Sequence, residues 1–121
     1  MSNLTANDSN GNNVEETDEG PSASTLYLSE DSIDADGSSI CISDAYNNRV
    51  LIWNSWPTEN AQPADIVLGQ IDFDSDTTLP DTDGNPSVLS AQNINYPTGC
   101  GFIGNDLWVN SYYRTVRYTA F

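Results

Sequence analysis

Aspartates at alternating positions are the residues of this chain whose type and spacing come closest to a known chemistry. Asp81 and Asp83 precede Gly84, and calcium loops also place carboxylates at alternate positions before a glycine. The first and last ligand positions of such a loop fall on Leu79 and Ser90, which do not supply the required carboxylates. We therefore interpret this run as a tight turn and not as a calcium site.

Two further groups of aspartates show the same alternation. Asp34 and Asp36 also precede a glycine, but serines occupy both terminal ligand positions. Asp72, Asp74 and Asp76 alternate along a polar stretch and can attract a cation weakly. The simpler interpretation is a turn for the first group and a solvated loop for the second. The sequence thus predicts no metal site and no cofactor.

Catalytic arrangements that depend on histidine are excluded, because the sequence contains no histidine. This rules out Ser-His-Asp and Cys-His nucleophiles as well as zinc sites built on Cys and His. Paired carboxylates are so frequent that no pair stands out as an acid/base couple. We predict no catalytic residue.

Cys41 and Cys100 are interpreted as buried strand thiols, with a disulfide between them as the less favoured alternative.

The charge balance narrows the range of partners. The chain carries 18 acidic residues against three arginines, for a net charge of −15. This charge repels phosphate backbones and anionic lipid, so neither nucleic acid nor a membrane is expected as a partner. Adaptation to a salt-rich environment and plain compositional drift with an acidic tail both remain open as its origin. No membrane span and no signal peptide is visible.

Strand-length segments rich in β-branched and aromatic residues, each bounded by turn residues, predict an all-β fold for residues 24–121. Residues 1–23 lack large apolar side chains and are expected to be a disordered acidic tail. The predicted first unit covers 24–70, a connecting loop covers 71–90 and the second unit covers 91–121. The predicted strands are 26–34, 39–43, 49–54 and 65–69, then 99–103, 106–110 and 114–120.

A polar knot, "SDAYNNRV", separates two apolar strands of the first unit. Asn47 and Asn48 tolerate the left-handed backbone angles of a hairpin turn, and Asp44 can accept hydrogen bonds from turn amides. Arg49 begins the next strand, where it can pair with Asp44 or with a neighbouring blade. We expect this pair to be partly exposed and to contribute about 0–1 kcal/mol. The predicted role of these four residues is structural.

An internal repeat relates the two units. "DGSSICISDAYNNRVLIWN" aligns with "GNDLWVNSYYRTVRYTAF" when the second copy has one residue fewer in its knot. The alignment pairs Ile40 with Leu107, and Val50 with Val116. Two consecutive antiparallel meanders indicate a repeat architecture, of which the β-propeller is an all-β form.

The repeat resembles the NHL-type β-propeller repeat. "SDAYNNRVLIWN" resembles the Asp-x-x-Asn-Asn-Arg-Val signature of that family, and "NYPTGCGFIGNDLWVN" is similar to its Pro-x-Gly entry and apolar strand. "QPADIVLGQIDF" resembles the connector between blades. The resemblance covers about residues 26–121. The second copy departs from it, because Ser111 stands in place of the Asp and Thr115 in place of the Arg.

The resemblance implies a partial propeller with two four-stranded blades, the second of them incomplete. It implies a binding or scaffolding module, a fragment of a larger propeller that contacts a protein or glycan. The alternative is a fragment of a lactonase-like or lyase-like propeller enzyme whose catalytic residues lie in other blades. The expected partners are further blades of a longer chain or other copies. An extracellular or cell-surface location is what the resemblance favours.

The core of this fold is predicted from strand alternation. Apolar side chains at every second position of a strand share one face of its sheet. The side chains expected to be among the most buried, on strands that pack between blades, are Ile40, Ile42, Val50, Ile52, Leu107 and Val109.

Overall fold

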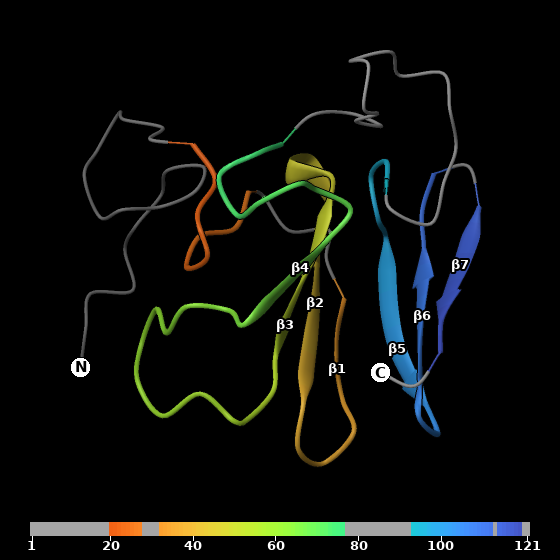
Figure 1. The fold of residues 1–121 in the computed structure, drawn as a ribbon, viewed down its shortest axis with the longest axis horizontal. Coiled ribbons are helices and arrows are strands. Elements are labelled where there is room, and N and C mark those ends of the chain that lie inside the picture. The colour runs from red at the N-terminus through yellow and green to blue at the C-terminus, as the bar shows by residue number, and fades with distance from the viewer. Residues whose placement is uncertain (1–19, 28–31, 77–92, 113, 120–121) are drawn as a thin grey trace.

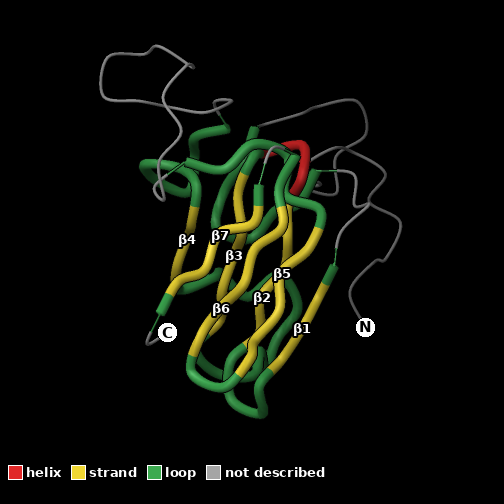
Figure 2. The backbone as a smooth tube through the Cα atoms, turned by 90° about the vertical axis from the view of Figure 1, so that its right-hand side faces the viewer, coloured by secondary structure: helices red, strands yellow, loops and turns green. Residues whose placement is uncertain are grey.

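The computed structural model describes residues 20–27, 32–76, 93–112 and 114–119, which form two antiparallel sheets and one short helical turn (Figure 1). The sheets follow one another along the chain and stack face to face (Figure 2). The predicted all-β fold class is confirmed.

The first sheet has four strands that pair in chain order. Polar turns separate them, and Asp36 closes the first hairpin by accepting the N–H groups of Ser38 (2.9 Å) and Ser39 (2.7 Å). The strands are β1 (Ile33–Ala35), β2 (Ile40–Asp44), β3 (Arg49–Trp53) and β4 (Ile66–Leu68).

The second sheet has three strands, again paired in chain order. They are β5 (Gly99–Ile103), β6 (Asp106–Asn110) and β7 (Thr115–Tyr118). The strands of both sheets lie within a residue or two of their predicted bounds, except β1. That strand was predicted over 26–34, and residues 28–31 lie outside the described residues.

Residues predicted as tail or connecting loop also make contacts with the first sheet. Arg49 donates to the carbonyl of Ser22 (2.9 Å), and the Ala64 N–H donates to the carbonyl of Ala23 (2.7 Å). Ser22 and Ala23 therefore contact the first unit at the end of the predicted tail. The rest of the predicted tail, 1–19, and most of the predicted loop lie outside the described residues.

The main core lies between the two sheets. Four of the six predicted core residues are fully buried there, namely Val50, Ile52, Leu107 and Val109. Ile94 and Cys41 complete this cluster, and Ile94 comes from the segment that leads into β5. Burial of this apolar surface is the main force that holds the sheets together.

The other two predicted core residues, Ile40 and Ile42, lie outside the main core. Both side chains lie on the face of the first sheet that points away from the second, where they pack with Leu51 and Trp53. Because successive side chains of a strand alternate between faces, the burial of Cys41 between the sheets sends its two neighbours to the opposite face. Ile40 is buried on that face, whereas Ile42 is only half-buried.

Strand pairing corrects the alignment of the two copies. Ile40 lies opposite Trp53, and its counterpart Leu107 lies opposite Tyr118. The segment from Leu107 to Tyr118 is two residues shorter than the segment from Ile40 to Trp53. The sequence alignment had assumed that the second copy is shorter by only one residue. Positions after the second knot are therefore displaced by one residue from their predicted matches.

The corrected alignment gives Val116 a new counterpart. Val116 pairs with Val109 in the second sheet, and the corresponding position of the first sheet is Leu51, which pairs with Ile42. The predicted match between Val50 and Val116 is wrong.

The two sheets stack in the same orientation. Ile40 points away from the second sheet, whereas its counterpart Leu107 points toward the first. One face of the first sheet therefore meets the opposite face of the second, as successive copies do when a repeat is propagated in one direction. Strands β1 and β5, the first of each sheet, lie side by side (Figure 1).

Candidate functional site: the polar knot

The four residues predicted as a turn motif come together at one end of the first sheet. Asp44 ends β2, a turn of 3-10 helix spans Ala45–Asn47, and Arg49 begins β3. Asn48 adopts the left-handed conformation with φ 53° and closes the turn through its N–H to the carbonyl of Ala45 (3.0 Å). Asparagine suits this position because its short polar side chain tolerates positive φ.

Asp44 and Arg49 form an ion pair that is completely buried. The distance from Arg49 Nε to Asp44 Oδ2 is 2.7 Å, and both side chains have 0% exposure. The predicted contact is confirmed, but the expectation of a partly exposed pair worth about 0–1 kcal/mol is wrong. Removing one partner of a buried pair typically costs about 3–5 kcal/mol, because the other charge stays buried without compensation.

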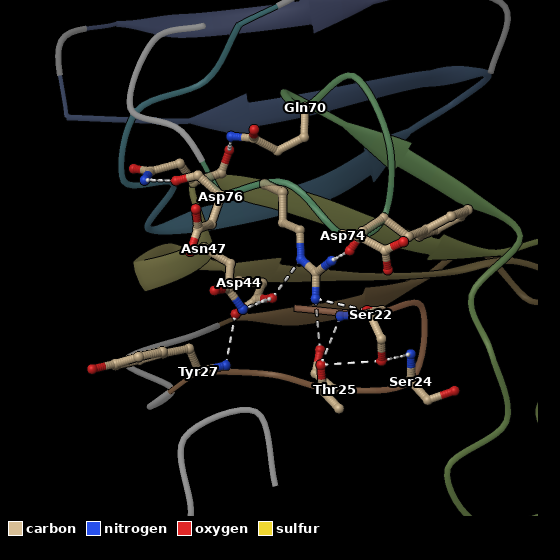
Figure 3. Close-up of polar contacts among 12 residues, drawn as sticks. Ser22, Ser24, Thr25, Tyr27, Asp44, Asn47, Gln70, Asp74 and Asp76 are labelled. Carbon is tan, nitrogen blue, oxygen red and sulfur yellow. Dashed lines mark hydrogen bonds and ion pairs between the residues drawn. The ribbon is translucent and has the colours of Figure 1, made fainter. Parts of the chain in front are cut away.

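Arg49 uses its remaining donors to hold two distant segments, one of which contains Ser22 and Thr25 (Figure 3). Its Nη2 donates to the carbonyls of Ser22 (2.9 Å) and Thr25 (2.8 Å), and its Nη1 donates to the carbonyl of Phe73 (2.6 Å). The planar guanidinium can satisfy several acceptors at fixed angles. Arg49 therefore fastens the segment before the first sheet and the segment after it to the same turn.

Asp44 is equally saturated. Its Oδ1 accepts the backbone N–H of Tyr27 (2.9 Å), and its Oδ2 accepts the side-chain amide of Asn47 (2.9 Å) as well as Arg49. With these donors in place and no exposed surface, the carboxylate is out of reach of a substrate in solution.

Asn48 connects the knot to the start of the second sheet. Its Oδ1 accepts the N–H of Tyr96 (2.9 Å), and its Nδ2 donates to the carbonyl of Asp76 (2.9 Å). Its own carbonyl accepts the side-chain amide of Gln70 (3.0 Å). The knot thus binds both sheets and their connecting segments.

A glycine beside the knot allows this close approach. Gly69 has φ +92°, and a Cβ at this position would lie 2.7 Å from Cβ of Ile94 and 3.0 Å from the carbonyl oxygen of Asn48. A residue with a side chain would be both strained and obstructed at this point.

The second copy has a shorter version of the same arrangement, which the sequence alignment missed. Ser111 takes the place of Asp44, as predicted, but the counterpart of Arg49 is Arg114 and not Thr115. The Ser111 N–H donates to the carbonyl of Arg114 (2.8 Å), and Arg114 Nη2 donates to the carbonyl (2.8 Å) and Oδ1 (3.0 Å) of Asn93. Arg114 therefore fastens the segment that leads into its own sheet, as Arg49 does.

Three tyrosines form an aromatic cluster around the knot that the sequence did not indicate. Tyr46 stacks on Tyr27 with ring centroids 5.2 Å apart and meets Tyr96 edge to face at 5.1 Å. The rings come from three segments, and Tyr46 remains 45% exposed. Such aromatic pairs stabilise by about 0.5–1.5 kcal/mol beyond burial.

Of the alternating aspartates, Asp36 and Asp72 close turns, whereas Asp34 lies on β1 and accepts the N–H of Phe102. Asp72 Oδ1 accepts the N–H of Asp74 (3.0 Å) and the hydroxyl of Ser75 (2.7 Å), and the Ser75 bond is the main cause of the lowered pKa of Asp72. Over the part of the chain that the structure describes, no three His, Cys, Asp or Glu residues are grouped so as to hold a metal ion. Asp81 and Asp83 lie outside the described residues.

The cysteines form a disulfide, contrary to the interpretation as thiols. Cys41 on β2 and Cys100 on β5 are bridged across the two sheets, with their Cα atoms 6.3 Å apart. The sequence analysis kept the bridge only as the less favoured alternative, because the approach of these strands depends on how the sheets stack.

Comparison with known proteins gives no match: no family model, no curated protein and no solved structure matches the chain. The resemblance to the NHL repeat therefore stays a hypothesis. Within the described ranges no helix is long and apolar enough to span a membrane.

Proposed function

We propose that this chain is a two-blade section of a β-propeller of the NHL-repeat type, and that it acts as a binding or scaffolding module. The observation that carries the proposal is the stacking of two equivalent sheets in the same orientation, with β1 beside β5. Propeller blades are related in this way around a ring, and a ring takes about four to eight blades. Further blades, from a longer chain or from other copies, are the partners that the proposal requires.

The outer surfaces of the two sheets support this view. The outer face of the second sheet, formed by Gly99, Gly101, Trp108 and Arg117, presents a tryptophan that is 37% exposed beneath the Arg117 guanidinium. On the opposite side of the pair, Ile33 is 66% exposed. A further blade packed on either side would remove these apolar side chains from water.

A binding role fits the chemistry of the site better than catalysis does. The carboxylate of the polar knot, Asp44, is buried and accepts internal hydrogen bonds from Tyr27 and Arg49. The knot therefore positions the two blades, while the ring they belong to offers its loops to a protein or glycan partner. Hydrolysis of lactones by the purified chain would contradict this assignment.

The test is the mass of the chain in solution as a function of concentration, measured by light scattering after size exclusion in molar salt. We expect association that Trp108→Glu abolishes, because the substitution places a charge on the outer face of the second sheet. Trp56→Glu is the matched control, because Trp56 is 56% exposed and lies outside both sheets. A chain that stays monomeric up to millimolar concentration would contradict blade stacking through this face.

A further inference from the structure

Three contacts between the sheets form a clasp at the edge of β5. The first is the Cys41–Cys100 disulfide. The others are polar: the N–H of Cys100 donates to Ser32 Oγ (2.8 Å), and the N–H of Phe102 donates to Asp34 Oδ2 (2.8 Å). These two N–H groups lie on the edge of β5 that does not face β6. Their acceptors are Ser32, which directly precedes β1, and Asp34 on β1, so this strand edge is not left unpaired.

The clasp is not part of the repeat. In the second copy Gly99 and Gly101 occupy the positions of Ser32 and Asp34, and Trp108 occupies the position of Cys41. The outer face of the second sheet therefore lacks all three groups with which the first sheet holds β5. The clasp therefore distinguishes the joint between these two sheets from a joint formed on the outer face of the second sheet.

We propose that the clasp is redox-controlled: the disulfide locks the two sheets together where thiols are oxidised, and its reduction lets the second sheet separate from the first. Disulfides persist in extracellular and other oxidising compartments and are reduced in the cytosol. The two-sheet unit would then reach its full stability only after entering an oxidising compartment. This inference is independent of the proposed propeller.

The exposure of the two sulfur-bearing residues sets the order of the exchange. Cys41 is fully buried, whereas Cys100 is partly exposed. The thiolate of a dithiol reductant attacks Sγ of Cys100, the Cys41–Cys100 bond breaks, and Cys41 leaves as a thiolate that takes up a proton. The second thiol of the reductant then displaces Cys100, so that one dithiol is oxidised and two cysteine thiols are formed.

The remaining contacts determine what reduction does. The two hydrogen bonds and the apolar core still join the sheets, but the second sheet has only three strands and depends on that core. The bridge closes a segment with a sequence separation of 59, and long closed segments give large stabilisation. Reduction should therefore loosen the second sheet first.

The test compares the oxidised and the reduced full chain, which contain the same side chains and differ only in the bridge. Thiol titration in denaturant should find no free thiol before reduction and two after it. Reduction should lower the Tm by roughly 10 °C or more. Hydrogen exchange should accelerate in β5, β6 and β7 while β2 and β3 stay protected.

The matched control is the double variant Cys41→Ala, Cys100→Ala, whose Tm should not respond to reductant. If this variant fails to fold, the comparison of the two forms of the wild type still decides the question. Two free thiols in chain produced under oxidising conditions would overturn the proposal. An equal Tm and equal exchange in the oxidised and reduced forms would also overturn it.

Discussion

Arg49 and Arg114 make the same kind of contact in the two sheets. Arg49 Nη2 donates to the carbonyl of Thr25 (2.8 Å), and Arg114 Nη2 donates to the carbonyl of Asn93 (2.8 Å). Each arginine thus ties the segment that precedes a sheet to the hairpin between the second and third strands of that sheet. The two arginines differ in their counter-ion. Arg49 forms an ion pair with Asp44, whereas the residue at the equivalent position beside Arg114 is the uncharged Ser111.

Arg49→Met should be strongly destabilising. The variant leaves the Asp44 carboxylate buried without its counter-ion and removes the donors to Ser22, Thr25 and Phe73. We expect a loss of about 3–5 kcal/mol in the free energy of unfolding. Urea unfolding monitored by circular dichroism measures it.

Arg117→Met is the matched control for that substitution. Arg117 pairs with Asp106 at 2.9 Å, but its side chain is 51% exposed. Removal of this pair should change the free energy of unfolding by less than about 1 kcal/mol. Equal effects of the two substitutions would show that the burial of the Asp44–Arg49 pair has no energetic consequence.

The double substitution Asp44→Leu, Arg49→Met should be less destabilising than Arg49→Met alone. Without the carboxylate, no uncompensated charge remains in the knot, and apolar replacements of buried pairs are often close to neutral. A double-mutant cycle in urea gives the coupling energy. Additive effects of the two single substitutions would contradict a direct interaction.

Gly69→Ala and Gly37→Ala separate backbone strain from steric obstruction. Both glycines have positive φ, +92° and +102°, but only a Cβ at Gly69 meets other atoms, with Ile94 Cβ at 2.7 Å. Gly37→Ala should cost about 1 kcal/mol from conformation alone. Gly69→Ala should cost about 1–3 kcal/mol more, because Ile94 in the core must shift. Thermal melts of both variants make the comparison, and an equal loss would argue against a tight contact at Gly69.

Acid should release the first hairpin at a low pH. The N–H groups of Ser39 and Ser38 hold the pKa of Asp36 below its ordinary value of 3.8. A lowered folded-state pKa means that the carboxylate stabilises the fold above the unfolded pKa and that this stabilisation is lost as pH falls through the folded value. Carboxyl NMR titration should place the Asp36 midpoint below 3.8. A midpoint at or above that value would contradict these hydrogen bonds in solution.

Local sequence patterns were sufficient to predict the strands other than β1 and the turn conformation of the polar knot. The alternation around Cys41 and the apolar run after Arg49 define β2 and β3, and Asn48 takes the left-handed angle that its residue type favours. These features depend on neighbouring residues in the chain. The burial of Ile40 was predicted, but the face on which it lies was not, because alternation defines two faces without saying which of them meets the second sheet.

Contacts between distant segments were beyond what the sequence could indicate. The carbonyls that receive the donors of Arg49 belong to Ser22, Thr25 and Phe73, and any residue type supplies a carbonyl. The burial of the ion pair follows from these contacts. Arg114 was missed for another reason: a one-residue gap and a two-residue gap fit the sequence almost equally well, and only strand pairing separates them.

Salt should stabilise the chain through screening. The net charge of −15 places like charges close together in the folded state. The Debye length falls from about 10 Å at 0.1 M to about 3 Å at 1 M, so this repulsion weakens as salt is added. We expect molar sodium chloride and potassium chloride to raise the Tm and the β-type circular dichroism alike. Calcium at low millimolar concentration should add little beyond screening.

Thermal melts across a salt series, with calcium as a separate arm, test this expectation. A Tm that does not depend on salt would rule out self-repulsion as a significant contribution to stability. A large rise in Tm with micromolar calcium would identify the aspartate-rich turns as metal sites.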